Sequence, residues 1–145
     1  MRLFELKGSD PFKYIAVNPR TYTFSAGNNE YVVEFGLGKG MNGYYLAFSQ
    51  GNLKDIRTIK ITKNVGGTDA SRIFQTIISI IKDFLSKHPD TTEIVFTADW
   101  TEPSRVKLYD AMVRWYRKFQ VGDNMYLLDK ISNDGDSKYS ITKVS

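Results

Sequence analysis

The stretch between residues 59 and 119 constrains the fold most, because strand patterns and helix patterns alternate along it. Residues 58–62 alternate polar and apolar side chains, as a half-buried strand does. Residues 69–87 carry an apolar stripe at helical spacing. Residues 93–97 contain three consecutive apolar side chains, which are typical of a strand covered on both faces, and a second helix is expected at 102–119. The stretch therefore predicts a β-α-β-α unit whose two strands run parallel.

Shorter strands are expected on both sides of this unit. The N-terminal half predicts a meander with strands at 3–6, 21–24, 30–35 and 43–49 and one helical turn at 10–15. The C-terminal part predicts a hairpin of strands 125–131 and 138–144. The predicted fold class is α/β: a three-layer domain with a mixed central sheet, an N-terminal antiparallel meander, the crossover unit and a terminal β-hairpin. The length of 145 residues fits a single domain, 1–145.

The composition narrows the classes of function. The chain has no cysteine and one histidine, so thiol catalysis, disulfides and sites built from thiolates or several histidines are excluded, and no metal cofactor is expected. No apolar run approaches the roughly 20 residues that a membrane helix needs, so no membrane partner is expected. Charged Glu5 and Lys7 lie where a signal peptide would be apolar. These features predict a cytoplasmic protein.

The order of elements resembles that of the Gcn5-related N-acetyltransferase superfamily. In that family, a characteristic loop precedes a helix. The loop begins with a basic residue or Gln, has Gly at its fourth position and has Gly or Ala at its sixth. In this chain, the first, fourth and sixth positions are Lys63, Gly66 and Thr68. The resemblance implies that backbone N–H groups of this loop bind the pyrophosphate of acetyl-CoA, as helix N-termini bind anions. The implied binding residues are Lys63, Val65, Gly66, Gly67, Thr68 and Arg72. The alternative interpretation is a Gly-Gly turn that Thr68 or Asp69 caps.

A second likeness concerns catalysis. The segment Leu108-Tyr109-Asp110 resembles the Leu-Tyr-Glu segment of the family, in which the tyrosine protonates the departing coenzyme A thiolate. A phenol with a pKa near 10 can donate a proton at neutral pH. Tyr109 also belongs to the apolar row of its helix, so the alternative is a packed aromatic side chain. Transfer to an amine also needs a base: Asp99, just after the second central strand, is the best-placed carboxylate, and Glu34 on the meander is the second candidate.

Three hypotheses of function follow. The first is a divergent acyl-CoA-dependent N-acyltransferase that acts on an unknown amine. The second is a non-catalytic domain that keeps the fold and binds a protein partner. The third is nucleic-acid binding, for which the basic helix at 102–119 and the nine Tyr and nine Phe residues supply cations and stacking rings.

Overall fold

The computed structural model describes residues 11–26, 29–38, 42–50, 70–99, 103–132 and 136–144. In chain order, its elements are β1 (Tyr14–Asn18), β2 (Thr21–Ala26), β3 (Asn29–Leu37), β4 (Gly43–Gln50), α2 (Ala70–Lys87), β5 (Glu93–Asp99), α3 (Pro103–Trp115), β6 (Lys118–Val121), β7 (Asn124–Ser132) and β8 (Asp136–Lys143). The strands form one eight-stranded sheet in the order β1-β2-β3-β4-β5-β8-β7-β6. Among the strands of the described residues, only β4 and β5 pair in parallel. The fold is thus mixed α/β, with a mostly antiparallel open sheet and two helices.

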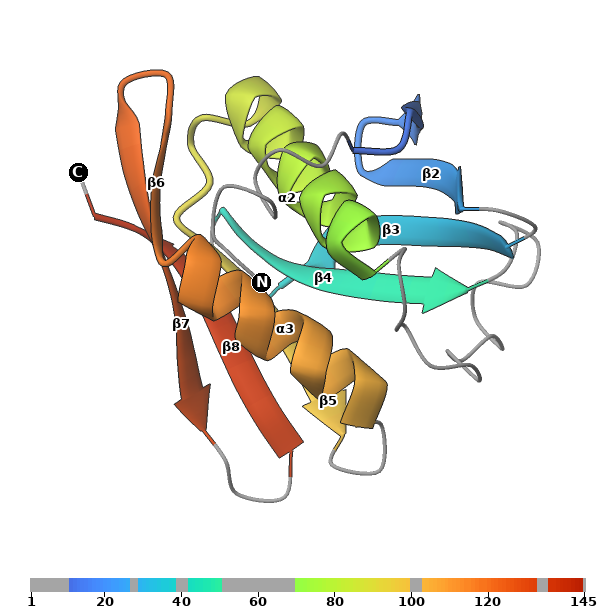
Figure 1. The fold of residues 1–145 in the computed structure, drawn as a ribbon. Helices are drawn as coiled ribbons and strands as arrows, with labels where there is room; N and C mark the ends of the chain where they lie inside the picture. Colours follow the sequence, from blue (N-terminus) through green and yellow to red (C-terminus); the bar gives the residue numbers. More distant parts are fainter. Residues whose placement is uncertain are drawn as a thin grey trace.

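Both helices lie on the same face of the sheet, α2 over the β2–β4 half and α3 over β5, β8 and β7 (Figure 1). The described part of the chain therefore has two layers, and the predicted third layer is not among the described residues. Side-chain alternation explains this arrangement. The face toward the helices carries buried aromatic and branched residues, whereas Thr23, Glu34 and Thr97 on the other face are polar and not fully buried. An antiparallel sheet can leave such a face without a covering helix.

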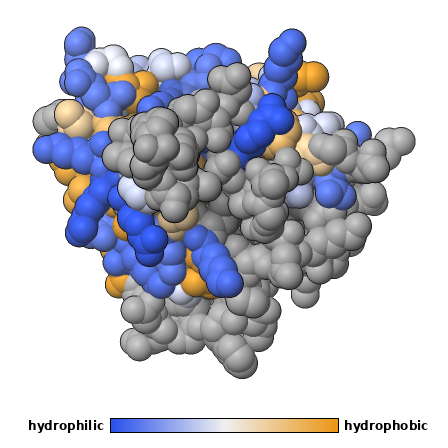
Figure 2. Space-filling view, in the orientation of Figure 1, coloured by the Kyte–Doolittle hydropathy of each residue, from blue (hydrophilic) through white to orange (hydrophobic). Residues whose placement is uncertain are grey.

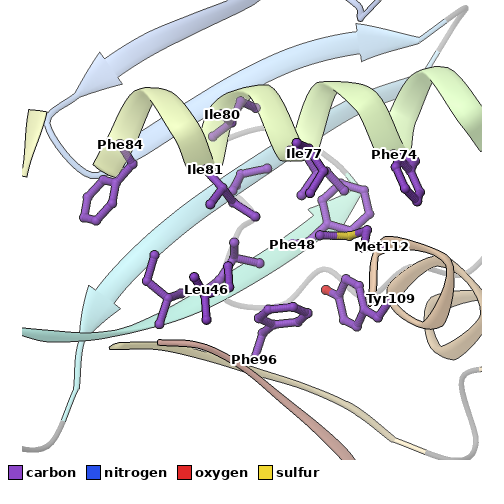
Figure 3. Packing of buried hydrophobic residues seen from close by; sticks show 14 of the residues in the cluster. Leu46, Phe48, Phe74, Ile77, Ile80, Ile81, Phe84, Phe96, Tyr109 and Met112 are labelled. Atoms are coloured by element: carbon purple, nitrogen blue, oxygen red, sulfur yellow. The ribbon is translucent and has the colours of Figure 1, made fainter. Parts of the chain in front are cut away.

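The core lies between α2 and the sheet. Ile77, Ile81 and Phe84 of α2 are completely buried, which confirms the predicted apolar stripe, and Ile80, which that prediction did not include, is completely buried as well. The Phe84 ring stacks on Phe35 of β3, with 3.9 Å between ring centroids. Figure 3 shows Ile77 and Ile81 pointing from α2 toward Leu46 and Phe48 of the sheet. The burial of an entire helix stripe makes α2 the best-anchored helix of the two.

The sheet has a parallel pair at its centre, which involves β4. The parallel neighbour of β5 is β4, with Gly43 opposite Glu93 and Tyr45 opposite Val95. The sequence predicts that residues 58–62 take this place, but they lie outside the described residues. The predicted strands at 43–49 and 93–97 are confirmed as β4 and β5.

Two predicted elements are wrong at the edges of the sheet. The helical turn expected at 10–15 is replaced by strand β1, which pairs with β2 and places Tyr14 opposite Phe24. The helix expected to reach residue 119 ends at Trp115, and strand β6 follows at once. Phe119 fits a helical row, but it is buried in β6, where its ring stacks on Tyr126 of β7. Cross-strand pairing thus overrides helical spacing at this position.

The outer sides of the helices are polar. On the side seen in Figure 2, hydrophilic side chains predominate among the described residues, and hydrophobic ones are scattered between them. Within the described ranges, no helix is long and apolar enough to cross a membrane.

Candidate functional site

The parallel strands β4 and β5 pair over a short distance only. Their register runs from Gly43 opposite Glu93 to Tyr45 opposite Val95, after which each strand continues without the other. β4 extends to Gln50 along β3, and β5 extends to Asp99 along β8. Figure 1 shows the two strands starting side by side and then running apart. We call the diverging segments, 46–50 of β4 and 96–99 of β5, the β4–β5 split.

The split leaves one edge of each diverging segment without a strand partner among the described residues. A strand edge exposes N–H and C=O groups that must find hydrogen-bond partners. Such an edge can bind an extended chain that carries amide groups. This backbone feature is the principal binding element that the structure offers, and the strand patterns in the sequence do not reveal it.

Tyr109 lies at the start of the split. It projects from α3, is only 1% exposed, and meets Phe96 edge-on with 4.7 Å between ring centroids. Phe96 is the first β5 residue beyond the paired part of the two strands. Figure 3 shows the Tyr109 ring near Phe96 and Met112, on the side of the sheet that α2 covers. Tyr109, the predicted acid, is therefore a packed core residue at the start of the split.

The second predicted base, Glu34, does not lie beside Tyr109. Glu34 lies on β3 opposite Ala47, and strand alternation directs it to the face away from the helices, because its neighbour Phe35 packs on α2. Tyr109 and Glu34 are thus on opposite faces of the sheet. Asp99 ends β5, where its backbone is opposite Asp136.

Most of the predicted coenzyme-binding loop lies outside the described residues: Lys63, Val65, Gly66, Gly67 and Thr68. Arg72, the remaining predicted contact, is in the first turn of α2. Its guanidinium sits over the Phe12 ring, 3.9 Å from the centroid. Such a cation–π contact holds the Arg72 head group beside the start of the helix.

A partly buried Tyr–Asp–Lys cluster joins α3 to the sheet. The Tyr139 hydroxyl of β8 donates a hydrogen bond of 2.7 Å to Asp110 Oδ1. Lys130 Nζ of β7 lies 3.1 Å from the same oxygen. Burial, followed by the hydrogen bond and negative charge of Asp110, raises the pKa of Tyr139 well above its usual value. The sequence interpretation missed this cluster, although Asp110 directly follows Tyr109.

A second cluster of the same composition joins α2 to β2. The Tyr22 hydroxyl donates a 2.9 Å hydrogen bond to Asp83 Oδ2, and Lys87 Nζ lies 3.0 Å from that oxygen. Burial and the neighbouring Asp83 carboxylate raise the pKa of Tyr22 as well. The Asp83 and Lys87 pair at helical spacing i, i+4 is the signal that could have revealed it. Both clusters tie a helix to the sheet. The α3 cluster also adjoins the split, because Tyr139 is opposite Phe96 and stacks on its ring.

The described residues contain no group of three or more His, Cys, Asp or Glu side chains that could hold a metal ion. The described residues thus form a mixed α/β domain in which one parallel pair diverges between strands that otherwise pair antiparallel. Residues 11–134 match DUF6934, a family of unknown function, and the chain belongs to this family. Neither the curated proteins nor the solved structures gave a match to the chain.

Proposed function

We propose that this protein is a divergent relative of the Gcn5-related N-acetyltransferases and binds an acyl-CoA at the β4–β5 split. One observation carries the proposal: the one parallel pair among the described strands ends after Tyr45 and Val95, while both strands continue. The order of elements around this pair, a meander, a crossover helix, a second helix and a terminal hairpin, is the order on which the resemblance rests.

The chemistry of coenzyme A suits this position. Its pantetheine arm is an extended chain with amide groups, which can hydrogen-bond to the free edge of residues 46–50 as an added strand would. The crossover that follows β4 leads to the start of α2, where the helix dipole favours a pyrophosphate. Lys63, Gly66 and Gly67 in that crossover, together with Arg72, are the proposed phosphate contacts.

The position of Tyr109 favours binding over rapid catalysis. A tyrosine that protonates a thiolate must reach the sulfur atom, but the Tyr109 ring is packed between Phe96 and Tyr139 and is almost completely buried. Glu34 lies on the other face of the sheet and is not available as its partner base. The second candidate function, a non-catalytic domain that binds a protein partner, gains support from the same two observations.

Titration calorimetry with acetyl-CoA tests the proposal. We expect the wild-type protein to bind, and a variant with both Gly66→Asp and Gly67→Asp to lose at least about tenfold in affinity, because two carboxylates would repel the pyrophosphate. Gly36→Asp is the matched control: a Cβ there meets no atom within 4 Å, so binding should be unchanged. No binding at millimolar ligand, or full binding by the folded double variant, would reject the site.

Tyr109→Phe separates a packing role from acid catalysis. Packing predicts a loss of about 1 kcal/mol of stability at most, with coenzyme A affinity retained. We expect this result, and no robust acetyl transfer by the wild-type protein to common amines. Clear wild-type transfer that falls by roughly 10²-fold in Tyr109→Phe would instead establish a working enzyme.

A further inference from the structure

A polar hollow lies beside the β1–β2 turn, on the far side of β4 from the split. Its volume is about 470 Å³, and it is lined by residues 18–21 and by Glu34, Phe35 and Gly36 of β3. Small-molecule sites commonly have volumes of about 300–1,000 Å³, so the hollow is large enough for a ligand. Gly36 is opposite Tyr45, where β4 is still paired with β5. The hollow is therefore separate from the coenzyme A site proposed above.

The wall of the hollow is held in place by backbone hydrogen bonds. The Arg20 N–H donates to Asn18 Oδ1 at 2.9 Å, which fixes the turn. The Phe35 N–H donates to the Arg20 carbonyl at 2.8 Å, which ties the turn to β3. A site with a rigid wall needs little ordering when a ligand binds.

Gly36 keeps the floor of the hollow open. Glycine inside a strand is destabilising and usually marks a close approach of other atoms or a special backbone angle. Neither applies here, since a Cβ at Gly36 would meet no atom within 4 Å and its φ is not in the left-handed region. A side chain at this position would instead occupy space in the hollow.

Two charged side chains that line the hollow, Arg20 and Glu34, have no hydrogen-bond or ion-pair partner in the described part of the chain. Glu34 is half-buried and shares its face with Thr21, the residue directly opposite on β2. No hydrogen bond or ion pair to the Glu34 carboxylate or the Arg20 guanidinium occurs within the described ranges. A half-buried carboxylate without a partner is costly, and a bound cation would remove that cost.

We propose that this hollow binds a small zwitterion of the amino-acid class. Glu34 receives the ammonium group, and the Arg20 guanidinium receives the carboxylate through two parallel hydrogen bonds. The open floor beside Gly36 takes the side chain of the ligand. The site needs both charges in one molecule, so an ammonium or a carboxylate alone binds more weakly.

NMR titration of the ¹⁵N-labelled protein with three probes tests this assignment. L-Leucine carries both charges, L-leucinamide lacks the carboxylate, and N-acetyl-L-leucine lacks the ammonium. We expect leucine to shift the amide signals of residues 20, 21 and 34–36, and each single-charge analogue to bind at least about tenfold more weakly. Equal binding of all three probes, or no shift of these signals with millimolar leucine, overturns the proposal.

Two variants make the test independent of folding. Gly36→Val places a β-branched side chain in the hollow at a position where strands favour one, so the protein should stay folded and lose leucine binding. Glu34→Gln should weaken leucine binding at least about tenfold, whereas Glu30→Gln, an exposed change on the same strand, should not. Leucine binding that persists in folded Gly36→Val refutes the site.

Discussion

The two helices cover the same face of the sheet but are held there in different ways. α2 buries a continuous stripe in which Ile77, Ile80, Ile81 and Phe84 have no exposed surface. In α3, by contrast, only Tyr109 and Met112 are buried among the side chains described. Each helix also makes one tyrosine–aspartate hydrogen bond with the sheet, Tyr22 to Asp83 at α2 and Tyr139 to Asp110 at α3, so this contact is a larger share of what holds α3. The comparison shows that apolar area holds α2, whereas α3 relies to a greater extent on a directional polar contact.

The two Tyr–Asp–Lys clusters also differ between the helices, in the exposure of the lysine and in the number of elements that they join. At α2, Asp83 and Lys87 belong to one helix, and the Lys87 side chain is 53% exposed. At α3, Asp110, Lys130 and Tyr139 come from three elements, and the Lys130 side chain is only 27% exposed. Solvent screens an exposed ion pair, so Lys87 should contribute less to stability than Lys130. The α3 cluster is therefore the one that ties separate parts of the chain together.

The largest expected effect tests the apolar anchoring of α2. Ile77→Ala removes a completely buried side chain and should lower the free energy of unfolding by roughly 2–5 kcal/mol through the cavity it leaves. Val113→Ala on α3, where the side chain is half-buried, should cost only about 1 kcal/mol. Urea denaturation measures both losses. Equal losses in the two variants would contradict the contrast between the helices.

An intermediate effect concerns stability at alkaline pH. The folded protein raises the pKa of Tyr22 and Tyr139 above the ordinary value of 10.0, so it holds both phenol protons more tightly than the unfolded chain does. This stabilisation is fully present below pH 10. As the pH rises above 10, the free energy of unfolding falls by about 1.4 kcal/mol per pH unit for each tyrosine. Tyr22→Phe and Tyr139→Phe should each reduce this dependence.

Urea denaturation at several pH values between neutral and alkaline measures the alkaline effect. The free-energy difference between wild type and each Phe variant should shrink as the pH rises, because only the wild-type protein has this tyrosine proton to lose. A difference that stays constant over the whole range would show that the phenols do not couple folding to pH in this way.

The smallest effect compares the two lysines. Lys87→Met removes an exposed i, i+4 ion pair and should cost about 0.5 kcal/mol or less. Lys130→Met should cost about 1 kcal/mol, because it takes the cation from a less exposed cluster. The methionine keeps most of the apolar stem in both variants. Thermal denaturation at low and high salt measures both losses of stability. A larger loss in Lys87→Met than in Lys130→Met would show that the α2 cluster contributes more to stability than the α3 cluster.

The sequence was sufficient to predict local structure where a residue pattern is compatible with only one type of secondary structure. The stripe of α2 and the strands β4 and β5 were predicted because apolar spacing and chain breakers agree there. The pattern was ambiguous at Phe119, which continues a helical row and also begins a strand, and cross-strand contact with Tyr126 decides in favour of β6. It was equally ambiguous at residues 10–15, where pairing with β2 produces β1.

The candidate sites were less predictable than the fold. The sequence directed attention to Tyr109 and Glu34, but their positions on opposite faces of the sheet follow from strand order and alternation. The hollow beside Gly36 unites residues from a turn and from a strand that are 13 or more positions apart, and no local spacing reveals it. The partners of Asp110 were unpredictable for the same reason.

By itself, the sequence determined the local structure: where α2 starts and ends, which of its side chains form the buried stripe, and where the central strands lie. These features depend on interactions within a few residues, which spacing and propensity report directly. The tertiary structure alone decided that both helices share one face, that β4 and β5 diverge after three residue pairs, and that Arg20 and Glu34 line one hollow. Those outcomes depend on how distant segments pair and pack, and the energies that select among the alternatives come from contacts that exist only in the folded chain.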